Sequence, residues 1–246
     1  MTVALTIAGS DASGGAGIQA DLKTFHRFGV FGEAVVTLIT VQNTRGVEQV
    51  HVLSPDLVEA QIRAVIEDIP PRAAKTGALG NDELATRIAK MAERFDFPLI
   101  VDPVMRAKNG VKLGGGLIRS FLLTPNLEEA SALAGFPVED LASMHRAAEK
   151  LHSLGAANVL IKGGHLRDDP VDVLYAAGEF HEFRAKRIGT HHTHGTGCAY
   201  SAAITAELAK GTPLSEAVRR AKNFVTGAIR SNPGLGSGAG PLNFFA

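Results

Sequence analysis

The chain has 246 residues, with 25 basic and 25 acidic residues, no net charge and one cysteine. The charge balance argues against a general binder of nucleic acid or anionic membranes, and one cysteine excludes an internal disulfide framework and fits a reducing compartment. The apolar N-terminal run is too short for a membrane span and lacks the features of a signal peptide. We therefore expect a soluble cytoplasmic protein, with one domain over residues 1–246.

The first part of the chain predicts two strands and two helices. Val3–Ala8 is a short apolar run typical of a buried strand, and the glycine-rich turn at 13–17 leads into a helix with apolar residues at i, i+4 and i+7. Ala34–Val41 is apolar and β-branched, as expected of a second buried strand. Ser54 and Pro55 then start a helix that a Pro-Pro pair ends.

The rest of the chain alternates short apolar runs with amphipathic helices, which predicts an α/β fold with a mostly parallel sheet and helices on both faces. The expected strands are Ala73–Thr76, Leu99–Val101, Phe121–Leu123 and Val159–Ile161, followed by a hairpin of Val171–Ala176 and Glu179–Arg184. The expected helices are Asp82–Arg94, Leu127–Leu133, Met144–Leu154, Ala199–Lys210 and Leu214–Ile229. Ligands of such sheets bind beyond the carboxyl ends of the strands, where the polar motifs of this chain lie.

Residues 194–200 place the only cysteine at the start of a helix. Gly195 and Gly197 leave the backbone free to aim successive N–H groups at one point, and a helix N-terminus attracts anions through such groups and its partial positive charge. The same field lowers the pKa of a thiol, which favours Cys198 as a thiolate base or nucleophile. The alternative is a buried structural cysteine after a turn.

Polar residues at strand ends predict a site for phosphate and a divalent ion. Asp102 follows the strand at 99–101, and Lys162 follows the strand at 159–161, where its charge suits a phosphate. Asn126 and Glu129 share one face of a helix's first turn. Together with Asp102 they supply oxygen ligands that suit a partly hydrated magnesium ion. Taken alone, Asn126 and Glu129 also fit an N-cap and its capping-box partner.

Two other segments keep alternative interpretations. Ser13–Gly17 suits either a phosphate cradle or an ordinary strand–helix turn. His191, His192 and His194 allow a metal cluster, although no second His/Cys group stands at a zinc-ligand spacing. The chain has no GxxxxGK[ST] motif, which excludes a P-loop enzyme.

Seven segments, in order, carry a resemblance to a known family. They are AGSDASGGAGIQADLKTF at 8–25, VQNTRGV at 41–47, AAKTGALG at 73–80, VDPVM at 101–105, TPNLEEA at 124–130, KGGH at 162–165 and HGTGC at 194–198. Together they resemble the hydroxymethylpyrimidine/phosphomethylpyrimidine kinases of thiamine biosynthesis, in the ribokinase-like superfamily. The resemblance implies a three-layer ribokinase-like fold, a homodimer, ATP and Mg²⁺ as cofactors, and phosphorylation of 4-amino-5-hydroxymethyl-2-methylpyrimidine and then of its monophosphate.

The resemblance also implies a role for each matching residue. The residues expected to hold the aminopyrimidine are Asp21 and Gln42, with Ala78 and Val104 against its ring. The residues expected to organise magnesium are Asp102, Asn126 and Glu129. The residues expected to bind the nucleotide are Lys162, Asn126, Gly195 and Gly197. The expected catalytic set is Cys198 as the base, Lys162 on the phosphates, and an anion hole of Gly195, Thr196 and Gly197.

Two departures from the family pattern affect these expectations. Ala78 stands where many relatives have methionine, which enlarges the pyrimidine pocket. The segment from Asp102 to Asn126 is about a dozen residues shorter than in relatives. Within it, Lys108–Gly116 is rich in glycine, and we expect it to act as a lid that orders when ATP and pyrimidine bind together.

Three rival functions follow from the same residues. A pyridoxal kinase is the nearest, because some bacterial pyridoxal kinases share this cysteine-bearing scaffold and Ala78 leaves a larger pocket. A non-catalytic ligand-binding module is a second, although a pure binder needs no general base such as Cys198. A cysteine hydrolase is a third, but the sequence assigns no histidine–acid partner to the cysteine.

Overall fold

The structure is a computed structural model that describes residues 1–104, 119–166 and 168–246. The lid expected at Lys108–Gly116 lies outside these residues. The strands are β1 (Val3–Ser10), β2 (Phe31–Asn43), β3 (Gly46–Val52), β4 (Ala74–Thr76), β5 (Leu99–Val101), β6 (Leu122–Leu123), β7 (Val159–Ile161), β8 (Val171–Ala176) and β9 (Glu179–Arg184). Within the described chain they form one nine-stranded sheet in the order β3-β2-β1-β4-β5-β6-β7-β8-β9.

The sheet is parallel at its centre and antiparallel at both edges. Each neighbouring pair from β2 to β7 is parallel. The hairpin β2–β3 closes one edge, and β7, β8 and β9 pair antiparallel at the other. The predicted mostly parallel α/β sheet is therefore confirmed. The carboxyl ends of β1, β4, β5, β6 and β7 meet at one edge, because parallel strands share a direction.

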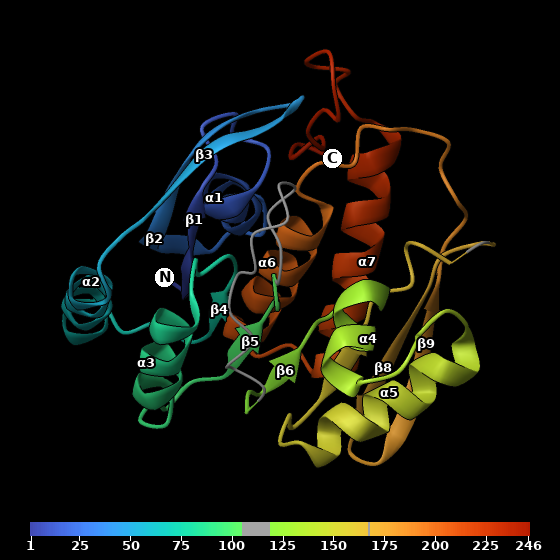
Figure 1. Cartoon of the computed structure of the whole chain (residues 1–246), viewed down its shortest axis with the longest axis horizontal. Helices are drawn as coiled ribbons and strands as arrows, with labels where there is room; N and C mark the ends of the chain where they lie inside the picture. Colours follow the sequence, from blue (N-terminus) through green and yellow to red (C-terminus); the bar gives the residue numbers. More distant parts are fainter. Residues whose placement is uncertain (105–118, 167) are drawn as a thin grey trace.

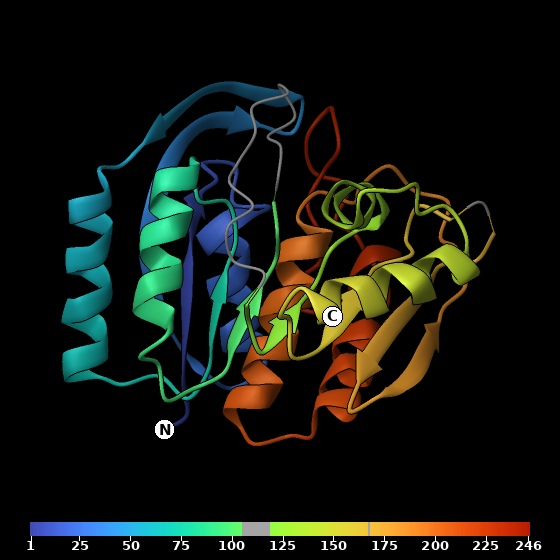
Figure 2. The same ribbon diagram turned by 60° about the horizontal axis from the view of Figure 1, so that its bottom comes forward.

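Helices cover both faces of the sheet (Figures 1 and 2). The helices are α1 (Gly17–Arg27), α2 (Pro55–Asp68), α3 (Asp82–Ala92), α4 (Leu127–Ala134), α5 (Leu141–Ser153), α6 (Thr196–Ala209) and α7 (Leu214–Arg230). Helices α2 to α5 pack into one hydrophobic core, and α1, α6 and α7 into the other. Alternate residues of β1 pack into the two cores: Leu5 and Ile7 into the first, and Ala4 into the second.

Helix α6 lies in the middle of its layer between α1 and α7 (Figure 1). Ten of its fourteen residues are buried, and most of these are small. A helix that is apolar all round is stable only where other elements cover every side. This packing fixes the position of its N-terminus, which begins after Gly195 and points toward the strand ends. The start of α6 is therefore a rigid part of the molecule.

Several elements differ from the sequence-based prediction: β2 begins at Phe31 rather than Ala34, and α6 begins at Thr196 rather than Ala199. Strand β3 was not predicted, because its exposed residues are polar and its pattern resembles a loop. Helix α5 begins at Leu141 rather than Met144, because Asp140 caps it: its Oδ1 accepts a hydrogen bond from the backbone N–H of Ser143 at 2.7 Å. Among the described residues, no helix combines the length and apolar character that a membrane span requires.

Candidate active site

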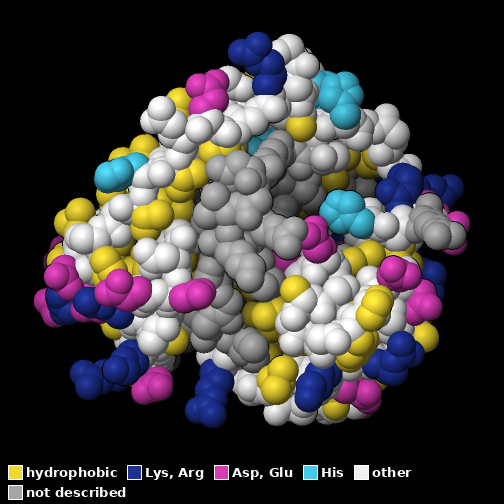
Figure 3. Space-filling model, viewed as in Figure 1, with side chains coloured by type: hydrophobic (Ala, Val, Ile, Leu, Met, Phe, Trp, Pro, Cys, Tyr) yellow, Lys and Arg dark blue, Asp and Glu magenta, His cyan; other side chains and the backbone are white. Residues whose placement is uncertain are grey.

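A cavity of about 590 Å³ lies beside the N-terminus of α6. Asp102, which follows β5, and Lys162, which follows β7, line it together with Gly195–Cys198 at the start of α6. The face of the molecule shown in Figure 3 carries its charged side chains mainly at the outer edges, over α2, α3 and α5. Three of the sequence motifs, far apart in the chain, thus line one cavity.

Asp102 and Lys162 form a buried ion pair on the wall of the cavity. The Lys162 Nζ donates to Asp102 Oδ1 at 2.7 Å, and the side chains are 14% and 3% exposed, lysine first. Burial opposes the charge on Lys162, but Asp102 and Glu129 outweigh it and raise the lysine pKa. Hydroxyls of Thr124 and Ser201 lie 3.4 Å from the two oxygens of Asp102. The pair therefore offers both charges to a ligand from fixed positions.

Asn126 and Glu129 form the capping box of α4. Asn126 Oδ1 accepts from the Glu129 N–H at 2.9 Å, and Glu129 Oε2 accepts from the Asn126 N–H at 2.8 Å. Burial raises the pKa of Glu129 to about 7, with Lys162 opposing this shift and Asp102 adding to it. The capping-box interpretation is confirmed, and a second acidic group lies near Asp102.

The donor set at this place fits a magnesium ion. Asp102, Glu129 and Asn126 all line the cavity, and the mutual repulsion of the two carboxylates favours a cation between them. In the described parts of the chain, no group of three or more His, Cys, Asp or Glu residues is arranged to hold a metal. A set of two carboxylates with an amide is what magnesium uses when water and phosphates supply its remaining ligands.

The N-terminus of α6 is built to accept an anion. Gly195 is its N-cap, with a left-handed φ of 80° and no side chain to bond the first N–H groups. A Cβ there would lie 1.8 Å from the backbone oxygen of Gly15, so only glycine fits. Thr196, Gly197 and Cys198 follow along the cavity wall. The Thr196 N–H donates to the Thr193 carbonyl at 3.3 Å, so it is not free for an anion. The N–H groups of Gly197 and Cys198 precede the first intrahelical bonds and lie at the positive end of the helix dipole.

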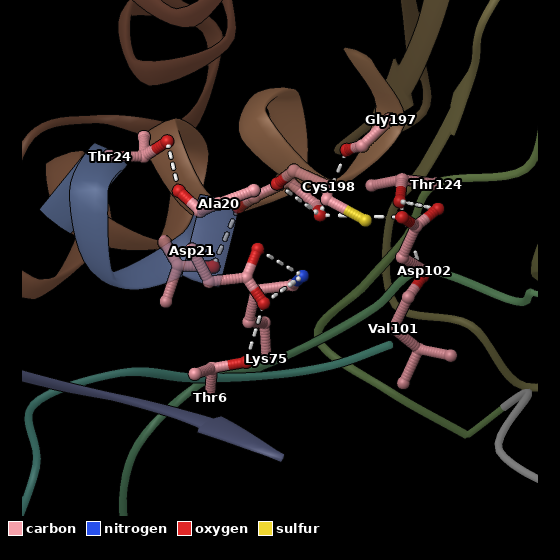
Figure 4. Close-up of polar contacts among 12 residues, drawn as sticks. Thr6, Ala20, Asp21, Thr24, Lys75, Val101, Asp102, Thr124, Gly197 and Cys198 are labelled. Atoms are coloured by element: carbon pink, nitrogen blue, oxygen red, sulfur yellow. Dashed lines mark hydrogen bonds and ion pairs between the residues drawn. The ribbon is translucent and has the colours of Figure 1, made fainter. Parts of the chain in front are cut away.

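The environment of Cys198 contradicts the expected low pKa. Burial raises the pKa of the Cys198 thiol to about 11, with the Lys75 ammonium opposing the shift and Asp21 and Asp102 adding to it. Figure 4 shows the thiol in the space between the Asp21–Lys75 pair and Asp102. The helix field is thus outweighed by the loss of water and by two carboxylates. Cys198 is a thiol at neutral pH in this structure.

Asp21 lies beneath the site rather than on its wall. Lys75 Nζ donates to both Asp21 oxygens at 2.9 Å, and the Thr6 hydroxyl donates to one of them at 2.7 Å (Figure 4). Both charged side chains are completely buried. The expected direct contact of Asp21 with a substrate does not fit this arrangement, because its oxygens are already bonded and shielded. Lys75 was missed, although a lysine inside an apolar strand signals a buried partner.

The other expected substrate residues lie at the ends of β2, β4 and β5. Gln42 is in the last part of β2, and its side-chain amide lies 3.1 Å from the ring of His194. Ala78 follows β4, and its carbonyl accepts from the Thr37 hydroxyl at 2.6 Å. Val104 lines the cavity. The structure thus places Val104 and the catalytic set around one cavity and Gln42 beside His194.

In the glycine-rich turn at 13–17, Asp11 accepts hydrogen bonds from the N–H and hydroxyl groups of the turn. The carboxylate of Asp11 accepts from the N–H and hydroxyl of Ser13 and from the N–H of Ala16, at 2.8–2.9 Å. The Gly14 N–H donates to the backbone oxygen of Asp11. An aspartate therefore takes the place that a phosphate would need, which favours the ordinary turn. His194 also bonds Asp11, at 2.7 Å, and is engaged there rather than in a metal cluster.

Comparison with known proteins gives consistent matches over nearly the whole chain. A family model described as phosphomethylpyrimidine kinase matches residues 11–243. The hydroxymethylpyrimidine/phosphomethylpyrimidine kinase of Bacillus subtilis is 44% identical over 99% of this chain and 94% of its own length. The thiamine biosynthesis bifunctional protein ThiED of Geobacter sulfurreducens is 47% identical over 97% of this chain, which spans only 51% of that longer protein.

Solved structures show the same fold. The pyridoxal kinase of Staphylococcus aureus, in complex with AMP-PCP and pyridoxal, is 35% identical with a TM-score of 0.92, covering 100% of this chain and 94% of that one. A phosphomethylpyrimidine kinase of Clostridium difficile is 40% identical with a TM-score of 0.81, covering 93% of this chain and 100% of that one. The expected ribokinase-like architecture is confirmed by these similarities.

Proposed function

Because the chain belongs to the phosphomethylpyrimidine kinase family, we propose that it phosphorylates 4-amino-5-hydroxymethyl-2-methylpyrimidine with ATP and then phosphorylates the monophosphate. It is a phosphotransferase of thiamine biosynthesis. The observation that carries the proposal is the convergence of the α6 N-terminus, Lys162 and Asp102 on one cavity. Phosphoryl transfer requires mainly alignment and charge neutralisation, and these groups supply both.

The phosphates of ATP are proposed to bind between the start of α6 and Lys162. The N–H groups of Gly197 and Cys198 and the lysine ammonium stabilise the negative charge of the transferring group. Asp102 and Glu129, with Asn126 beside them, would hold a magnesium ion, which when bound supplies further positive charge to the phosphates. The Asp102–Lys162 bond keeps the lysine extended toward the same place.

The far part of the cavity suits the nucleoside. It runs from Gly164 past residues 185–188 to α7, where apolar Val225 and Ile229 line it. An apolar wall with polar groups at one end is typical of pockets for planar cofactors. We therefore assign ATP to this side of Lys162 and the pyrimidine to the side of Gln42 and Val104.

Cys198 is proposed to accept the proton of the substrate hydroxyl. Its support is position: the thiol lies at the anion-binding helix start, next to Asp102 and Lys75. A raised pKa makes the thiolate a stronger base but a rarer species at neutral pH. Base catalysis by Cys198 therefore predicts a rate that increases with pH.

The protein is also proposed to act as a homodimer in the cytoplasm. Ile39 and Val41 are half exposed on the same face of β2, and hydrophobic side chains gather over the β2–β3 hairpin (Figure 3). Paired strands with an exposed apolar face are a common place for a second copy to bind. The single cysteine fits the reducing cytoplasm.

One assay tests the proposed reaction. Purified protein is incubated with Mg-ATP and the hydroxymethylpyrimidine, and the monophosphate and diphosphate are separated by chromatography. We expect both products and little product when the divalent ion is removed with a chelator. Absence of product with Mg-ATP, or equal product without any divalent ion, would contradict the proposal.

Pyridoxal is a second candidate substrate. The similarity to the S. aureus pyridoxal kinase in complex with pyridoxal, with a TM-score of 0.92, favours it, as does the small side chain of Ala78 beside the expected pocket. The ratio of kcat/KM for the aminopyrimidine to that for pyridoxal decides between the two. A ratio well above one is expected from the family match over residues 11–243.

A further inference from the structure

A hydrogen-bonded chain of three side chains connects the glycine-rich turn with the hairpin that carries Gln42. His194 Nε2 lies 2.7 Å from Asp11 Oδ2 and 3.1 Å from Nε2 of the Gln42 side-chain amide. The side chains of His194 and Asp11 are 9% and 4% exposed, so water competes little for these bonds. One ring nitrogen therefore serves two partners that come from distant parts of the sequence.

Asp11 can only accept hydrogen bonds here. Its carboxylate takes two bonds from Ser13 and one from Ala16 in addition to the contact with His194. Burial opposes its ionisation, but the hydrogen bonds from His194 and Ser13 outweigh it and lower the pKa of Asp11 to about 2. A carboxylate surrounded by donors has no proton to give. The proton in the short contact must therefore reside on His194 Nε2.

A protonated Nε2 also decides which way the Gln42 amide points. An N–H group cannot accept, so an amide NH₂ opposite it would place two donors against each other. The oxygen and nitrogen of a carboxamide have nearly the same shape, so the bonding partners determine which atom occupies which place. The 3.1 Å contact sets the Gln42 nitrogen against this N–H, so the amide must be turned over to bring its oxygen to His194. Both amide hydrogens are then left for a partner elsewhere.

We propose that the Asp11–His194 pair is a positioning unit that fixes the Gln42 amide as a pure donor toward the substrate. This inference rests on the proposed function, in which Gln42 contacts the aminopyrimidine. A ring nitrogen next to the exocyclic amine has a lone pair that accepts from such a donor. Selectivity for a heterocycle with an acceptor nitrogen is thus set by residues that do not themselves touch the ring.

The first test examines the unliganded wild-type protein. Long-range ¹H–¹⁵N correlation spectra of the imidazole groups show which ring nitrogen carries a proton. The His194 signals are assigned by their absence in His194→Phe. We expect a protonated Nε2 at neutral pH. An unprotonated Nε2 would overturn the proposal, and this result does not depend on any catalytic activity.

The second test uses substrate discrimination. The kcat/KM values are measured for the aminopyrimidine and for an analogue in which the ring nitrogen next to the amine is CH. In the wild type the analogue leaves the Gln42 donor unpaired, and we expect a loss of about tenfold or more. In His194→Phe the amide is free to turn, and the ratio between the two substrates should fall to about one- to threefold.

A neighbouring histidine supplies the matched control. His192 accepts a hydrogen bond from the Gly240 N–H, whereas Gln42 contacts His194, so His192→Phe should keep the wild-type ratio. A purely structural role of His194 would lower kcat/KM for both substrates equally and leave the ratio unchanged. That outcome, in a folded variant, would overturn the positioning role. Absence of activity toward the pyrimidine in the wild type would instead contradict the proposed function and leave the spectroscopic result standing.

Discussion

Cys198 lies at the first turn of α6 among buried charges, and its surroundings define a test at the scale of one residue. Cys198→Ala should lower kcat by about a hundredfold or more, because the proton acceptor is lost, while ATP binding changes little because the backbone donors remain. Cys198→Asp should retain part of the activity, since a carboxylate also accepts a proton. Steady-state kinetics with both substrates varied gives these values, and wild-type turnover in the alanine variant would make the residue structural.

The pH dependence of the same reaction tests the raised pKa. The thiolate of Cys198 becomes abundant only as the pH approaches about 11. If this thiolate is the base, log kcat/KM should increase with pH by about one per unit across the neutral and mildly alkaline range. In Cys198→Asp the carboxylate is already ionised there, so its profile should be flat. Parallel profiles in the two proteins would remove the base assignment.

The Asp21–Lys75 pair illustrates what a buried charge needs. Asp21→Asn removes the carboxylate that bonds the Lys75 ammonium at a site with no access to water, and we expect a loss of about 3–5 kcal/mol in the free energy of unfolding. The double change Asp21→Asn with Lys75→Met removes both charges and should recover part of the loss. Urea unfolding of the wild type, of the single variants Asp21→Asn and Lys75→Met and of the double variant measures the coupling. Additive losses would show that the two side chains act independently.

Glu33 makes the stability of the protein depend on pH. Its side chain is buried in β2 with Oε2 unpaired, and burial together with nearby Asp68 raises its pKa from 4.5 to about 7. The folded protein holds this proton more tightly than the unfolded chain does. The contribution of protonated Glu33 to the free energy of unfolding is therefore full below about pH 4.5 and is lost as the pH rises through about 7.

Glu33→Gln isolates this contribution, since the amide has a similar shape and does not titrate. The difference between the unfolding free energies of the wild type and the variant should therefore change with pH between about 4.5 and 7 and be constant outside that window. Chemical denaturation at a series of pH values measures it. A difference that does not vary with pH would show that Glu33 titrates normally.

At the scale of elements, the entry to α6 combines a backbone requirement with a binding role. Gly195→Ala places a Cβ against the Gly15 carbonyl and strains a left-handed φ, so the turn must move. We expect Gly195→Ala to lower the free energy of unfolding by about 2 kcal/mol more than the left-handed φ alone would cost an alanine. Because the anion-binding N–H groups move with the turn, kcat should also fall by about a hundredfold.

Gly211 is the matched control for this change. It has a similar left-handed φ of 85°, and no atom lies within 4 Å of the place that a Cβ would occupy. Gly211→Ala should lower the free energy of unfolding by only about 1–2 kcal/mol and leave kcat unchanged. Thermal unfolding and kinetics of both variants, measured together, separate the close contact from the conformational strain. Equal effects on stability in the two variants would contradict the role of the Gly15 contact.

At the scale of the whole molecule, the exposed face of β2 predicts assembly. Ile39 and Val41 are 50% and 49% exposed, on alternate positions of one strand. Burying them against a second copy gains hydrophobic free energy, and a charge at the centre of that contact opposes it. Ile39→Glu should therefore shift the protein from dimer to monomer in analytical ultracentrifugation. Leu154→Glu, at a 41% exposed position outside this face, is the control and should leave the dimer intact. A wild-type monomer would refute the assembly.

Most of the architecture and the identity of the site motifs could be predicted from local sequence patterns. Helix and strand periodicity predicted the α/β sheet, and a glycine-flanked cysteine with strand-end Asp102 and Lys162 predicted a phosphate site. These features are local, because side-chain spacing and turn chemistry act within a few residues. Strand β3 escaped prediction for the same reason: its polar edge pattern becomes a strand only when β2 pairs with it.

The electrostatics of the site depend on contacts between residues far apart in the chain. It brought Lys75 to Asp21, Asp11 to His194, and two carboxylates to Cys198. Burial and the sum of distant charges set a pKa, and neither is visible in a local motif. The helix start therefore suggested a low thiol pKa, whereas the folded chain raises it. The orientation of the Gln42 amide depends in the same way on contacts between residues far apart in the chain.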